Sequence, residues 1–127
     1  MTVFARPMVA VVFAAFILCA ETCLHAESIL RPAQWVDLPI HDWLAGAFLL
    51  YGAVKARRDW TVGRPYLASA WAFMASLLAA AFVGHWEEWA LGSPSGEWIS
   101  NGAFVVIIGV LLAISACGTA ASLRARA

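Results

Sequence analysis

Charged residues are scarce in this sequence of 127 residues. Only 13% are Asp, Glu, Lys or Arg, whereas 63% are hydrophobic. Soluble domains carry nearer a quarter charged residues, and a chain of this length has room for one domain. The scarcity of charge therefore excludes a soluble globular domain and an intrinsically disordered chain. The mean hydropathy of +0.79 indicates an integral membrane protein instead.

Cysteines and catalytic motifs are also few or absent. Three cysteines in apolar surroundings exclude a disulfide scaffold, and no CxxC or zinc-finger spacing occurs. Cys19 and Cys23 share a helix face, and we interpret them as small apolar side chains. The sequence has no phosphate-binding loop, nucleophile elbow or HExxH motif. We therefore expect no nucleic-acid partner and favour a non-catalytic protein.

Four apolar segments are present, each long enough to cross a bilayer. The predicted spans run over about 3–24, 38–54, 65–86 and 98–123. Asp37 is the predicted N-cap of the second span, and Pro39 and Pro65 suit the first turns of the second and third. Short connections make consecutive helices antiparallel neighbours. The predicted fold is all-α: a single domain, residues 1–127, forming an up-down-up-down bundle of four transmembrane helices.

Charges of opposite sign are segregated between the two ends of this bundle. Seven of the eight basic residues fall on one side, together with Asp59. They are Arg6, Lys55, Arg57, Arg58, Arg64, Arg124 and Arg126. Basic loops mark the cytoplasmic side, so both termini are predicted to be cytoplasmic, in a multi-pass protein of a bacterial-type inner membrane. The other side holds seven acidic residues and all three histidines.

Tryptophans support the same orientation. The predicted outer interface carries a belt of indoles that anchor the helices in the headgroup region. They are Trp35, Trp43, Trp86, Trp89 and Trp98. An alternative concerns the first span, because residues 1–26 also resemble a signal peptide cleaved after Ala26. A cleaved protein would keep the same orientation with three spans.

Small residues predict how the helices pack, because helices in lipid associate through close contacts between small side chains. The predicted seams contain three sets of residues. They are Ala45, Gly46, Leu49, Gly52 and Ala53 in the second span, Ala68, Ala72, Ala75 and Ala79 in the third, and Gly102, Gly109, Ala113 and Ala116 in the fourth. Besides the lipid bilayer, we expect a homo-oligomeric or a membrane-protein partner.

The candidate site lies at the predicted outer ends of three helices. Each end supplies a histidine and a carboxylate: Glu21 with His25, His41 with Asp42, and His85 with Glu88. The spacings of four and three place the first and third pairs on single helix faces. Ionisable groups near a membrane usually face an interior or a water-filled cavity. Glu21 in particular lies close behind an apolar run and needs a partner.

Three interpretations of these six residues remain open. Imidazole and carboxylate ligands suit a transition metal such as zinc, copper or iron. His–carboxylate pairs also handle protons near neutral pH, and nearby tryptophans can bind a cationic ligand. The third interpretation is that they merely cap helices and pair with one another.

The sequence thus predicts a small inner-membrane protein whose outer polar cluster binds a metal ion or small ligand as an accessory subunit. A packing or assembly subunit without a ligand is the first alternative. A small metal-dependent or redox membrane enzyme is the second.

Overall fold

The computed structural model describes residues 3–31, 38–94 and 99–124. Its elements are η1 (Val3–Ala5), α1 (Pro7–Leu24), α2 (Ala26–Leu30), α3 (Ile40–Arg58), α4 (Trp60–Ala90) and α5 (Asn101–Arg124). The prediction of an all-helical chain is confirmed, since these described ranges contain no strand. The predicted cap Asp37 lies outside the described residues, as do Trp35, Trp98, Glu97 and Arg126.

Three of the four long helices, α1, α4 and α5, are long and apolar enough to cross a membrane. The prediction of four such helices is therefore confirmed only in part. Helix α3 differs because Asp42 lies in its first turn and Lys55 in its last. The apolar run between them, from Trp43 to Val54, covers about 18 Å at the α-helical rise. A bilayer core is about 30 Å thick.

The connection between α3 and α4 is much shorter than the predicted loop of residues 55–64. Only Asp59 separates the two helices, and its carboxylate accepts a hydrogen bond of 3.2 Å from the backbone N–H of Val62. This N-cap lets α4 start immediately, so Pro65 lies inside the helix instead of near its start. The prediction that Pro65 lies in the first turn of its helix was therefore wrong.

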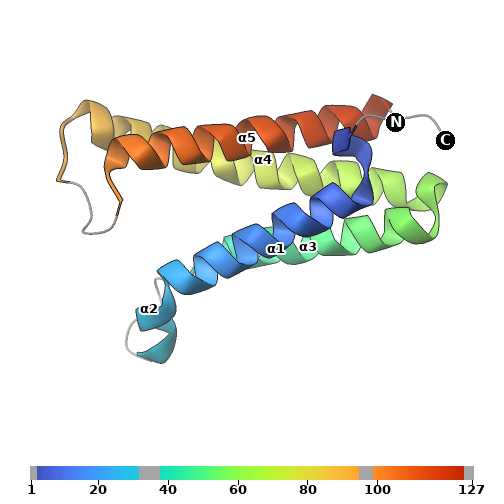
Figure 1. The fold of residues 1–127 in the computed structure, drawn as a ribbon, viewed down its shortest axis with the longest axis horizontal. Coiled ribbons are helices and arrows are strands. Elements are labelled where there is room, and N and C mark those ends of the chain that lie inside the picture. The colour runs from blue at the N-terminus through green and yellow to red at the C-terminus, as the bar shows by residue number, and fades with distance from the viewer. Residues whose placement is uncertain (1–2, 32–37, 95–98, 125–127) are drawn as a thin grey trace.

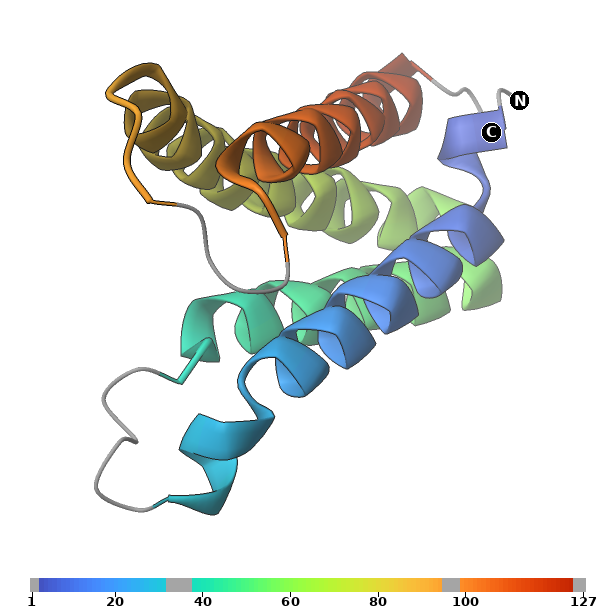
Figure 2. The same cartoon turned by 60° about the vertical axis from the view of Figure 1, so that its left-hand side comes forward.

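The long helices pack in chain order, α1 against α3, α3 against α4 and α4 against α5, with neighbours antiparallel (Figure 1). The turn η1 contacts α5 and so links the beginning of the described chain to its last helix. From the end that carries the two termini, the α1–α3 and α4–α5 pairs diverge toward the opposite end (Figures 1 and 2). We call these the closed end and the open end.

The core lies toward the closed end, around Trp71 of α4. The Trp71 side chain is fully buried and contacts Phe13 of α1 edge to face, with ring centroids 5.1 Å apart. On α5, Gly118 leaves space for the indole, since a Cβ there would lie 2.6 Å from Trp71 Cε2. The buried residues of α4 extend from Gly63 to Leu78, and its remaining turns carry none.

Small residues form the seam of α3 as predicted. Its five predicted residues, Ala45, Gly46, Leu49, Gly52 and Ala53, are all buried. A Cβ on Gly52 would lie 2.9 Å from the Cα of Leu67, so the α3 and α4 backbones nearly touch.

The predicted seams of α4 and α5 were wrong in part. On α4, Ala68 is buried but Ala72 is exposed, and on α5 Ala113 and Ala116 are exposed. Helix α5 instead buries a face rotated away from them. That face consists of Asn101, Val105, Ile108, Ser115, Gly118 and Ser122. The seam on α5 includes Gly118, which accommodates Trp71, and leaves Ala113 and Ala116 outside it.

Candidate polar site at the open end

Glu21 and His25 form the α1 part of the site. Helix α1 ends at Leu24, and His25 caps it, with its backbone N–H directed at the Glu21 carbonyl. The His25 ring Nδ1 lies 3.0 Å from the Glu21 carbonyl oxygen and 3.5 Å from Glu21 Oε2. A carbonyl oxygen only accepts, so the hydrogen bond requires a proton on Nδ1 and leaves Nε2 free to accept a proton or bind a metal.

His41 and Asp42 contribute the α3 part, from the first turn of that helix. A carboxylate is favoured there by the unsatisfied N–H groups of the helix N-terminus. The Asp42 carboxylate repels the Glu21 carboxylate. The imidazoles of His41 and His25 attract the Asp42 carboxylate when they are protonated. The ends of α1 and α3 thus bring together two carboxylates and two histidines.

His85 and Glu88 form a separate pair on α4. His85 Nδ1 lies 3.3 Å from Glu88 Oε2, as an ion-pair contact without hydrogen-bond alignment. The His85 ring stacks on Phe104 of α5, with centroids 4.9 Å apart and the planes 6° from parallel. These contacts hold His85 within the α4–α5 pair of helices, on the other side of the divergence seen in Figure 2.

The six predicted site residues therefore divide into two groups. Glu21, His25, His41 and Asp42 lie at the α1–α3 end, and His85 and Glu88 lie on α4. Over residues 3–31, 38–94 and 99–124, no three His, Cys, Asp or Glu side chains are arranged to hold a metal ion. A metal ion at the α1–α3 end would have to draw these side chains together.

Aromatic residues surround the open end. Trp86 and Trp89 are about half exposed and contact each other, with ring centroids 5.3 Å apart. Trp43 follows Asp42 directly, and its indole N–H is buried with no hydrogen-bond partner. Sequence analysis placed Trp43 in an interfacial belt and missed this unpaired donor. No local signal marks it, because burial of the indole depends on which helices pack around it.

The comparisons with known proteins identify no relative. No family model matches this sequence, and no curated protein or solved structure matches it either.

Proposed function

We propose that this chain crosses a bacterial-type inner membrane four times, with both termini on the cytoplasmic side. Helix α3 is the fourth crossing in this proposal. It lies between α1 and α4 and buries a full face of small residues, so neighbouring helices shield much of its surface from lipid. Asp42 and Lys55 would reach the two headgroup regions. Six of the seven basic residues of the described chain lie at the closed end and only Arg31 lies at the open end, which favours a cytoplasmic position for the closed end.

We further propose that the open end binds a small cation at Glu21, His25, His41 and Asp42, in a non-catalytic, accessory role. The observation that carries this proposal is the electrostatic interaction of Glu21 on α1 with Asp42 on α3, together with the interaction of Asp42 with His25 and His41. Two negative charges in a partly buried site repel, and a bound cation removes that repulsion. The nitrogen and oxygen donors suit zinc, copper or iron.

Metal analysis of detergent-purified protein tests the cation site. We expect about one bound Zn²⁺, Cu²⁺ or Fe²⁺ per chain. The paired change Glu21→Gln with Asp42→Asn should abolish binding, because it removes both carboxylates while keeping their shapes. The matched change His85→Ala with Glu88→Gln should leave binding intact.

Equal loss of metal in both variants would show that all six residues form one site and contradict the division between the helix pairs. Protein without metal in every case would overturn the metal proposal. Reporter fusions at both termini, and an intact mass that includes residues 1–26, test the four-span topology separately.

An assembly subunit is a second candidate function, favoured by small residues on uncovered faces. Among residues 3–31, 38–94 and 99–124, no atom of another helix would lie within 4 Å of a Cβ on Gly84 of α4, and Ala80 is exposed one turn earlier. Small residues of this kind let another membrane helix approach closely. A fixed partner or a second copy that co-purifies, and is released by Gly84→Leu, would support this function.

A further inference from the structure

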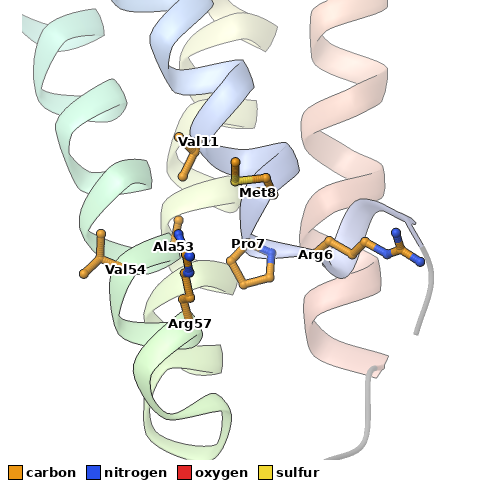
Figure 3. A pocket seen from close by; sticks show the side chains of 7 residues that line it. All are labelled: Arg6, Pro7, Met8, Val11, Ala53, Val54 and Arg57. Carbon is orange, nitrogen blue, oxygen red and sulfur yellow. The ribbon is translucent and has the colours of Figure 1, made fainter.

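A pocket at the closed end has a different character from the open-end site. It has a volume of about 430 Å³ and lies between the start of α1 and the end of α3 (Figure 3). Its lining consists of Arg6, Pro7, Met8, Val11, Ala53, Val54 and Arg57. The two arginines are basic, and the other five residues are apolar. Figure 3 shows the Arg57 side chain along the pocket and the Arg6 side chain pointing away from it. The pocket therefore combines a hydrophobic wall with one arginine beside it and a second at its edge.

The two arginines are available for an anionic ligand. Over the described ranges 3–31, 38–94 and 99–124, neither Arg6 nor Arg57 forms an ion pair with a carboxylate, and both are exposed. The acidic residue nearest in sequence, Asp59, uses its carboxylate to cap α4. Lys55 and Arg58 add positive charge on the same stretch of α3. This end of the molecule thus carries an excess of positive charge.

The apolar wall indicates that the ligand has a hydrocarbon part. Met8 and Val54 are 61% and 46% exposed at the pocket, which leaves apolar surface uncovered directly beside the arginines. A volume of about 430 Å³ is typical of a pocket for a small ligand, and it holds only part of a phospholipid. The remainder of the acyl chains would lie along the outer surfaces of α1 and α3.

We propose that this pocket binds an acidic phospholipid from the cytoplasmic leaflet. Arg57 holds the phosphate at the pocket, and Arg6 reaches it by turning its side chain from the outward direction drawn in Figure 3. The upper part of one acyl chain packs on Met8, Val11 and Val54. Anionic lipids concentrate at that leaflet and are attracted to juxtamembrane basic residues. The proposal rests on the membrane insertion and orientation proposed above, and it is independent of the cation site.

Native mass spectrometry of the full chain, released from nanodiscs of phosphatidylglycerol and phosphatidylcholine, tests this inference. We expect one phosphatidylglycerol molecule retained with a preference of about tenfold over phosphatidylcholine. The double change Arg6→Gln with Arg57→Gln should abolish that preference. Val54→Trp should also displace the lipid, because it fills the apolar half while leaving every charge in place.

The matched control is Arg58→Gln with Arg124→Gln, which removes the same charge from the same end outside the pocket lining. It should keep the preference. Equal losses in the two double variants would mean diffuse attraction and would overturn the proposal. So would lipid retention in Val54→Trp, or binding of glycerol phosphate alone as tightly as the phospholipid. Membrane insertion is tested separately, before the lipid measurement. If the chain were not inserted, alkaline carbonate would extract it from membranes.

Discussion

The closed and open ends of the molecule are built from the same four long helices but pack differently. At the closed end, Gly52, Gly63 and Gly118 lie where a Cβ would collide with the adjoining helix. At the open end, α4 carries Phe82 and Trp86, whose rings stack on each other, and it buries no residue beyond Leu78. The size of the side chains along a seam thus determines where neighbouring helices meet.

The different packing of the closed and open ends also determines which polar groups lie near each other. In lipid, apolar side chains gain nothing from leaving one hydrocarbon environment for another, so helices close only where side chains fit together. The diverging open end separates His85 and Glu88 from the α1–α3 group. The closed end brings the start of α1 beside the end of α3 and creates the pocket of Arg6 and Arg57.

The largest predicted effect compares two tryptophans of α4. Trp71→Ala should lower the free energy of unfolding by about 3–5 kcal/mol, because it leaves a cavity beside Phe13 and Gly118. Trp86→Ala should cost less than about 1 kcal/mol, since Trp86 is 48% exposed. Equilibrium unfolding in mixed detergent micelles measures both values. Similar losses in the two variants would contradict the packing difference between the ends.

Two glycines of α4 test the same difference in packing between the closed and open ends. Gly63→Ala should destabilise the protein by about 1–3 kcal/mol, because the new Cβ would overlap the α3 backbone at Ala56. Gly84→Ala should raise stability by up to about 1 kcal/mol, since alanine has the higher helix propensity and the described part of the chain leaves space for a Cβ at this position. Thermal unfolding of the two variants side by side gives the sign of each change. If Gly84→Ala instead destabilised the protein, another residue would have to lie against Gly84, which would contradict the loose packing of the open end.

The smallest predicted effect concerns charge at the open end. At pH 8 without metal, where an ordinary imidazole is neutral, Glu21→Gln should raise stability by about 0.5 kcal/mol. The reason is that it removes the repulsion between Glu21 and Asp42. Glu88→Gln is the control, because the Glu88 side chain is 55% exposed and its ion-pair contact is with His85. A gain from Glu88→Gln as large as that from Glu21→Gln would argue against a special α1–α3 group.

Local patterns predicted some elements well and others poorly. The seam of α3 was predictable because its small residues recur at helical spacing on one face. The α3–α4 connection was not, because a cluster of basic residues reads as a loop, whereas the capping carboxylate of Asp59 lets two helices follow each other directly. The seam of α5 was predicted only in part, since Ala113 and Ala116 are exposed whereas Gly118 accommodates Trp71 across the interface.

For the candidate site, too, local patterns predicted contacts within one helix but not contacts between helices. The pairs Glu21–His25 and His85–Glu88 follow from helical spacing, and the structure contains both contacts. The approach of Asp42 to Glu21 was expected only as part of a single six-residue cluster. The division of that cluster depends on the angle between the two helix pairs, which no spacing within one helix encodes.

Residue types and their spacing along the chain suffice to predict that the chain is helical and that most acidic and most basic residues lie at opposite ends of the helices. Each of these depends on residue type or on spacing within one segment, so it can be read along the chain. Only the tertiary structure decided which faces are buried, where the helices diverge and which distant residues meet. The pocket between the start of α1 and the end of α3, like the interaction of Glu21 with Asp42, arises from the rotation and tilt of whole helices, and these follow from side-chain fit across interfaces.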